Sequence, residues 1–156
     1  MQQLARELLA LSRRWRATMD GILKPFGITF AGWQVLESVW LSQSGLTQVQ
    51  IAQEICVEPS TLTRQLDLLV AQGLIERFSV PGDRRANLIR LSSHADTLME
   101  EVSRVLADEN ARMADTFGRE RLAEAKTVVR ELSARLASGA LATPPANHFF
   151  KRMARA

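Results

Sequence analysis

The sequence predicts a mainly α-helical protein in which terminal helices flank a helix-turn-helix and a single β-hairpin. Three observations support this fold class. Apolar residues recur every three or four positions over most of the chain, which is the spacing of one helix face. Residues 47–66 have the spacing of a helix-turn-helix, and after them two extended runs, LIERFSV and LIRLS, enclose the turn-rich segment PGDRRAN.

Proline, glycine and capping residues place the ends of the first three helices. The first helix is expected to begin near Leu4 and to end at Lys24-Pro25-Phe26-Gly27, because proline and glycine end helices. A second helix is expected over about residues 29–41, with Trp33 and Trp40 facing inward. Thr47 is a natural N-cap for a short third helix that ends near residue 55.

The third and fourth helices have the spacing of a helix-turn-helix, which needs a small residue, a tight turn four residues later and an apolar residue six further on. Ala52, Cys56 and Leu62 take these positions, and Cys56 stands where glycine is commonest. Pro59 suits the first turn of the fourth helix and Gly73 its end. We expect Cys56 to be a small buried side chain, as opposed to a redox switch. The other buried positions are expected to be Ile51, Ile55, Val57, Leu66, Leu69 and Val70.

The opposite side of the fourth helix is polar and would face DNA. Arg64 can offer a bidentate fork to guanine, and hydroxyl and amide groups can bond to base edges or phosphates. A solvated polar helix face is the alternative interpretation. The DNA-binding candidates on this helix are Ser60, Thr61, Thr63, Arg64 and Gln65.

The hairpin loop favours the DNA-binding interpretation. It holds Asp83, Arg84 and Arg85 together, directly after the helix-turn-helix. An arginine on such a turn suits the narrow minor groove, where the negative potential is strongest. Asp83 would hold an arginine in place by a charge-assisted hydrogen bond.

Composition argues against an exported protein and against an enzyme. The balance of 20 basic and 17 acidic residues gives a formal charge of only +3, a weak indication of a polyanionic partner. Cys56 is the only cysteine, so no intrachain disulfide forms, and charged residues interrupt every apolar run near the start before it reaches signal or membrane-span length. We therefore expect a cytoplasmic protein without membrane contact. His94 and His148 lie far apart, which supports neither a metal site nor a catalytic dyad, and we expect no cofactor.

Beyond the hairpin, apolar spacing predicts two more helices, separated by a break at Gly118. The last one carries a stripe from Leu122 to Leu136 that needs a partner surface. We therefore expect residues 1–28 and 93–138 to form a helical dimerisation region, residues 29–92 a winged helix-turn-helix with a two-stranded wing, and residues 139–156 a C-terminal extension.

These residues resemble the MarR family of transcription regulators, and most closely its SlyA-like branch. The matching segments are Leu23-Lys24-Pro25, Trp33, ICVEPSTLTRQLDLL from Ile55, Gly73-Leu74-Ile75 and, above all, DRRANLIRLS from Asp83. The resemblance covers the chain up to about Leu136. It implies a triangular homodimer whose terminal helices interlock and whose wings flank a pseudopalindromic site in double-stranded DNA, with a role as repressor or anti-silencer.

The resemblance also assigns residue roles. It makes Arg64 the recognition-helix arginine, Asp83 the wing aspartate and Arg85 the minor-groove arginine. Similar proteins release DNA when a small aromatic or phenolic acid binds between the dimerisation helices and the DNA-binding lobe. The pocket candidates here are Arg13, Arg16, Trp33 and Glu37, although the namesake of the SlyA-like branch has histidine in place of Glu37, and an acid there weakens carboxylate binding.

Other functions remain open at this point. A regulator without a ligand, or one that senses oxidants through Cys56, shares the same fold. A winged-helix module for protein contacts would lack the outward Arg64 and the Asp83 to Arg85 cluster. A small cofactor-free enzyme would need convergent acid, base or nucleophile side chains, which the sequence does not offer.

Overall fold

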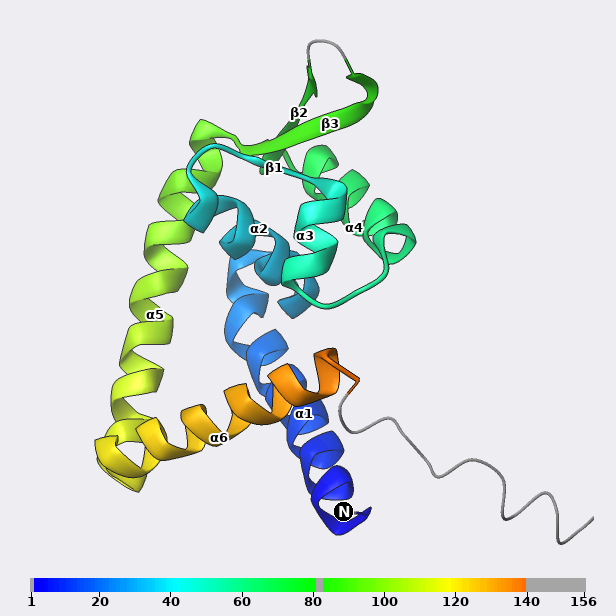
Figure 1. Ribbon diagram of the computed structural model, residues 1–156. Coiled ribbons are helices and arrows are strands. Elements are labelled where there is room, and N and C mark those ends of the chain that lie inside the picture. Colours follow the sequence, from blue (N-terminus) through cyan, green and yellow to red (C-terminus); the bar gives the residue numbers. More distant parts are fainter. Residues whose placement is uncertain (1, 81–82, 140–156) are drawn as a thin grey trace, which may run out of the picture. The chain divides into compact units, whose positions relative to one another are not determined.

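The computed structural model describes residues 2–80 and 83–139, with the side chains of residue 80 and residues 83–86 outside the description. The chain divides into two compact units, Met1–Leu106 and Ala107–Ala156. Helix α5 (Ser93–Phe117) begins in the first unit and ends in the second, which also holds α6 (Arg119–Ala137). The other elements, drawn in Figure 1, are α1 (Gln2–Leu23), η1 (Lys24–Phe26), α2 (Phe30–Ser42), β1 (Leu46–Thr47), α3 (Gln48–Glu54), α4 (Pro59–Ala71), β2 (Ile75–Val80) and β3 (Asp83–Leu91).

The junction between α1 and α2 is built as the sequence predicts. Gly27 adopts a left-handed φ of 71°, and its N–H donates to the carbonyl of Lys24 at 3.0 Å, which ends the short η1 turn. The Thr29 hydroxyl then caps α2 by accepting from the N–H of Gly32 at 3.1 Å. Asp20 of α1 accepts from the N–H of Phe30 at 2.7 Å, so α1 also contributes to the cap of α2.

Each helix of the first unit contributes to one apolar core. Apolar side chains recurring at helical spacing make one face of each helix suitable for burial, and the sheet adds residues from its inner face. The largest fully buried side chains are Leu23, Val35, Leu36, Ile51, Leu66, Leu69, Ile75, Ile89, Met99 and Val102. Burial of the α4 residues seats that helix and leaves its polar side on the surface.

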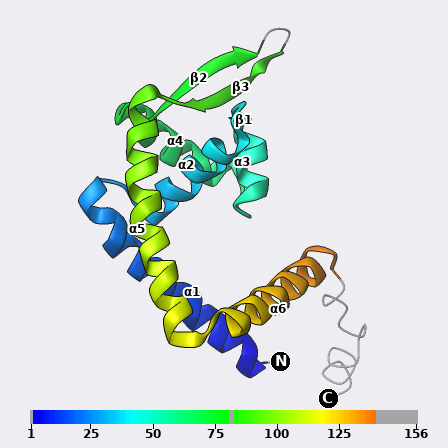
Figure 2. The ribbon, with the colours of Figure 1, turned by 90° about the vertical axis from the view of Figure 1, so that its left-hand side faces the viewer.

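The sheet has three antiparallel strands in the order β1-β3-β2, where the sequence predicted two. The predicted hairpin is present as β2 and β3, and Figure 2 shows it extending beyond the helices around it. The additional strand β1 pairs Leu46 with Ile89 and Thr47 with Leu88. Thr47 also caps α3, because its hydroxyl accepts from the N–H of Gln50 while the Gln50 side chain accepts from the N–H of Thr47. The start of α3 is thereby joined to the wing.

Four side chains predicted to be buried are exposed. Trp40 is 37% exposed, Val57 37% and Val70 40%. Trp40 and Val70 lie at the edges of the buried faces of α2 and α4, where the neighbouring residues Val39 and Leu69 fill the core instead. Cys56 is exposed because it reverses the chain between α3 and α4 with a left-handed φ of 57°, which also explains why glycine is common there. The argument that Cys56 is inert because it is buried is therefore wrong.

The N-terminal part of α1 and the whole of α6 carry apolar side chains that are exposed to solvent. In α1, Leu11 is 60% exposed and Trp15 43%, whereas Met19 and Leu23 are buried. Within the described residues α6 buries none of its side chains, and Leu136 remains 59% exposed. Exposed apolar stripes of this kind mark contact surfaces. In the same described part of the chain, no helix combines the length and the apolar character that crossing a bilayer requires.

Candidate nucleic-acid interface

Helix α4 carries the polar surface that the sequence singled out. Pro59 occupies the first turn, where its missing N–H costs no hydrogen bond, and the N–H of Thr61 donates to the carbonyl of Glu58 at 2.9 Å. Leu62, Leu66 and Leu69 are buried on one side of the helix. Because successive residues are rotated by about 100°, the opposite side carries mainly polar residues, with the exposed Leu68 beside them.

Most of the predicted recognition residues are open to solvent. Ser60, Thr61, Thr63 and Arg64 are exposed, and Gln65 is half-buried. Among the described residues, Arg64 takes part in neither of the two ion pairs, which join Arg77 to Asp67 and Arg112 to Glu109. Its guanidinium is therefore available to an external acceptor.

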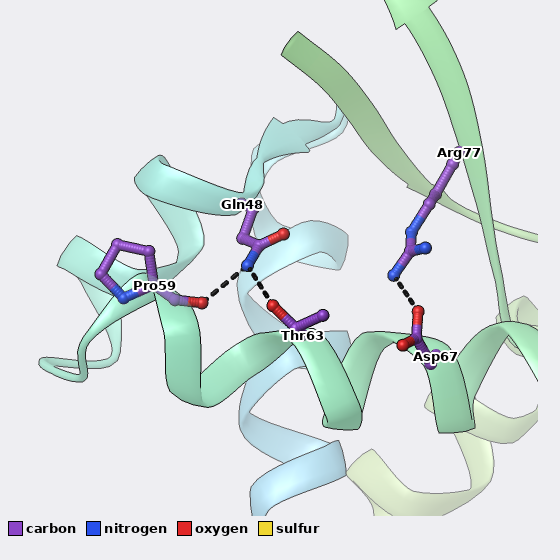
Figure 3. Close-up of polar contacts among 5 residues, drawn as sticks. All are labelled: Gln48, Pro59, Thr63, Asp67 and Arg77. Atoms are coloured by element: carbon purple, nitrogen blue, oxygen red, sulfur yellow. Dashed lines mark hydrogen bonds and ion pairs between the residues drawn. The ribbon is translucent and has the colours of Figure 1, made fainter. Parts of the chain in front are cut away.

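A side chain from α3 holds one of these recognition residues in place. Gln48, the first residue of α3, directs its amide nitrogen at the start of α4 (Figure 3). That nitrogen donates to the carbonyl of Pro59 at 2.6 Å and to the hydroxyl of Thr63 at 3.0 Å. Gln48 thus orients Thr63 and braces the two helices against each other. Nothing in the local sequence marks Gln48 as part of the site, because its partners lie 11 and 15 residues away on another helix.

An ion pair joins α4 to the first strand of the wing. The guanidinium of Arg77 on β2 lies 2.7 Å from a carboxylate oxygen of Asp67 (Figure 3). Neither partner of this ion pair was among the site residues predicted from the sequence. At 58% and 35% side-chain exposure, the pair contributes less than about 1 kcal/mol to stability. Its main effect is geometric, since it ties the orientation of the wing to the polar face of α4.

The wing residues predicted to contact DNA lie at the start of β3. Asp83 is the first residue of that strand and its backbone pairs with Val80, after an irregularity in register between Ser79 and Val80. Arg84 and Arg85 follow in the same strand. The side chains of Asp83, Arg84 and Arg85 lie outside the described residues, so their predicted contacts with DNA remain predictions.

One of the four predicted pocket residues lines a described hollow. Arg16, which lies over the Phe30 ring at 5.9 Å, lines a hollow of about 420 Å³ beside α4. Arg64 and Gln65 line the same hollow, with an apolar floor that includes Leu62 and Leu68. Of the other pocket candidates, Trp33 is only 3% exposed, whereas Arg13 and Glu37 are exposed and belong to neither this hollow nor a second one beside Arg16.

A pair of glutamates lies between α2 and α3. Although Glu37 is in contact with solvent, partial desolvation raises the pKa of its carboxyl above the ordinary value of 4.5, and the nearby charge of Glu54 raises it further. Glu54 itself accepts a hydrogen bond from the hydroxyl of Ser38, a buried side chain. A negative charge on Glu37 beside Glu54 is therefore unfavourable in the folded protein.

Replacing Glu37 with glutamine should make the protein more stable at neutral pH. Because the pKa of Glu37 is raised in the folded protein, the folded state favours the protonated carboxyl. The stability that protonated Glu37 contributes is fully present below pH 4.5 and is lost as the pH rises through the folded-state pKa. Glu37→Gln removes that loss, so we expect a gain of up to about 1 kcal/mol at pH 7, as for other partly exposed charges, and none near pH 4. Urea unfolding at both pH values measures it, with Glu100→Gln as the control for loss of an exposed charge on α5. A gain that is equal at both pH values would contradict the prediction.

Comparison with known proteins identifies what this arrangement is similar to. A family model described as the MarR family matches residues 28–86, from before α2 into β3. The crystal structure of the transcriptional regulator PA3341 shares 32% identity and a TM-score of 0.75, over 86% of this chain and 98% of the other. DNA-bound, overoxidized AbfR shares 25% identity and a TM-score of 0.72, over 88% of this chain and 92% of the other.

A third structure resembles the chain in fold. It is a cysteine-to-serine mutant of MarR from E. coli complexed with operator DNA, with 24% identity and a TM-score of 0.76 over 83% of this chain and 93% of the other. Together these likenesses confirm the mainly α-helical winged helix-turn-helix fold that the sequence predicted.

Proposed function

Because this chain belongs to the MarR family, we propose that it regulates transcription by binding double-stranded DNA in a sequence-specific way as a homodimer. Family membership makes it a transcription regulator and not an enzyme. The observation that carries the proposal is the division of α4 into a fully buried apolar side and an open polar side centred on Arg64. A helix held in this way can enter a major groove without disturbing its own core.

Each part of the surface has a distinct role in this proposal. Arg64 forms a bidentate contact with guanine, while Ser60, Thr61, Thr63 and Gln65 bond to base edges or phosphates. Gln48 supports this by fixing the Thr63 hydroxyl. The wing residues Asp83, Arg84 and Arg85 approach the adjacent minor groove, with Arg85 as the inserted side chain. In a two-fold symmetric dimer, recognition helices about 34 Å apart read an inverted repeat.

Replacing Arg64 with alanine tests the proposal. We expect Arg64→Ala to weaken binding by about 1 to 3 kcal/mol for DNA with the preferred base and much less for DNA with that base changed. Arg85→Ala should instead weaken binding to both sequences. The measurement is fluorescence anisotropy at fixed salt, on fragments that the parent protein recovers from a genomic library and on versions with single base changes.

A control separates this contact from a general loss of charge. Arg112→Ala removes an arginine whose side chain is 73% exposed and pairs with Glu109 in the second unit. It should bind DNA like the parent. If Arg64→Ala and Arg85→Ala also bind like the parent, the proposed contacts with DNA are wrong.

The dimer proposal rests on the exposed apolar stripes of α1 and α6. The parent should sediment as a dimer at micromolar concentration. Leu11 is 60% exposed, and Leu11→Asp should raise the dimer dissociation constant at least about tenfold, because it places a charge in a desolvated contact. Val49→Asp on α3, where Val49 is 53% exposed, should leave it unchanged. A monomeric parent, or a Leu11→Asp variant as dimeric as the parent, would rule out this interface.

The finer assignments are part of the same proposal. We place the chain in the SlyA-like branch, as a repressor or anti-silencer that acts in the cytoplasm. A small aromatic or phenolic acid is the proposed effector. This is supported by the hollow that Arg16 and Arg64 line, which has an apolar floor. The floor can pack against the aromatic ring, and the two guanidinium groups can bind the carboxylate. An effector bound to Arg64 competes directly with DNA for the same guanidinium.

A further inference from the structure

A third hollow lies away from the polar face of α4, where the end of α2, the strand β3 and the first turn of α5 meet. Its volume is about 550 Å³, and its walls include Val39, Trp40, Gln43, Arg90 and Asp96. All of these residues belong to the first unit. We propose that this hollow binds a small aromatic zwitterion, a compound that carries one ammonium and one carboxylate group beside an aromatic ring.

The aromatic part of the ligand is suggested by Trp40. This side chain is 37% exposed, although the adjacent Val39 is only 3% exposed and Leu91 on the facing strand is half-buried. A large aromatic ring open to solvent at the edge of an apolar wall offers area for a second ring to stack on. The hollow is therefore suited to a planar apolar group.

The two charged groups of the ligand are suggested by Arg90 and Asp96. Both line the hollow, and among the described residues neither takes part in an ion pair, with each other or with a third residue. A ligand with only a carboxylate would be attracted by Arg90 and repelled by Asp96, and a ligand with only an amine would meet the reverse. A ligand with one group of each sign complements both walls.

Arg90 is held in position for this role. Its guanidinium carbon lies 5.3 Å from the centre of the Phe78 ring, a cation–π contact across the hairpin. Its stem passes so close to Gly45 that a Cβ on that glycine would lie 2.7 Å from Cγ of Arg90. The positive wall is therefore set by the fold before any ligand arrives, which reduces the entropy cost of binding.

Three probes test the site; they share a phenyl ring on a two-carbon chain and differ in the charged groups that this chain carries. L-Phenylalanine carries both charges, 3-phenylpropionate only the carboxylate and 2-phenylethylamine only the amine. Each is titrated into the full-length ¹⁵N-labelled chain, and the indole N–H of Trp40, assigned with a Trp40→Phe variant, is followed by NMR. Phenylalanine should shift this signal with a millimolar dissociation constant, and each single-charge probe should bind at least about fivefold more weakly.

An aspartate variant shows whether the selectivity comes from this site. Asp96→Asn should remove the preference for phenylalanine over phenylpropionate, while Asp108→Asn, an exposed position further along α5, should retain it. Equal affinity for the three probes, shifts at Trp15 or Trp33 in place of Trp40, or no shift up to about 10 mM phenylalanine would each overturn the proposal. No DNA is present, so the result does not depend on the proposed function.

Discussion

Replacing Gly45 with alanine is expected to lower the free energy of unfolding by about 2 to 4 kcal/mol. Gly45 has a φ of 86°, and an added Cβ would lie 2.7 Å from the carbonyl oxygen of Ile89 and 2.7 Å from Cγ of Arg90. The first of these atoms is backbone of the central strand and cannot move without disturbing the pairing of β1 with β3. Left-handed strain adds to this steric overlap. Urea unfolding at one fixed protein concentration measures the loss.

Gly73→Ala is the matched control for backbone strain alone. Gly73 also has a positive φ, 69°, but nothing lies within 4 Å of the place where its Cβ would be. We expect a loss of about 1 kcal/mol for this variant. If both glycines cost the same, the close approach of the residue 45 backbone to β3 does not contribute to stability.

Replacing Leu66 with alanine should cost about 2 to 5 kcal/mol, the range for a fully buried leucine. Leu66 is 0% exposed and lies on the inner side of α4, so its removal leaves a cavity beneath the recognition helix. A helix of only 13 residues depends on this packing, because isolated helices of that length are marginal in water. The variant should therefore lose DNA affinity in parallel with stability.

Leu68→Ala provides the comparison within the same helix. Leu68 is 47% exposed, so we expect its loss to cost less than about 1 kcal/mol. Urea unfolding of both variants under the same conditions measures the two losses in free energy of unfolding. Equal costs for Leu66→Ala and Leu68→Ala would mean that α4 is not seated by its buried side.

The helices and the hairpin were predictable because local chemistry marks their ends. Pro25 and Gly27 end the first helix, Thr47 caps the third, and Gly73 follows the fourth with a left-handed φ. Each of these signals acts within a few residues of the backbone that it shapes. The exposed position of Arg64 followed from helix periodicity in the same way.

Features that depend on distant partners were not predictable. A strand of two residues, β1, has no periodicity of its own and exists because β3 offers it a pairing edge. Gln48 and Arg77 look like ordinary surface residues in the sequence. Their roles appear only when Thr63 and Asp67 are brought next to them by the fold.

The errors in predicted burial also have a physical origin. A helix face suited to the core is broad, and a sequence does not state where its edge falls. Val70 follows the buried Leu69 by one residue, yet that rotation is enough to leave it 40% exposed. Cys56 shows a different limit, because spacing located the turn correctly but did not predict that the side chain at the left-handed position faces solvent.

Thr47 is both a strand residue of β1 and the N-cap of α3, and this double role should limit how the wing can move. Its backbone is paired with Leu88 in the sheet, while its hydroxyl starts the first turn of α3. A movement of β3 away from the helices would displace Thr47 and so disrupt the N-cap of α3. The strand β3 and the helix α3 are therefore coupled through Thr47, so a displacement of β3 should be transmitted to the first turn of α3.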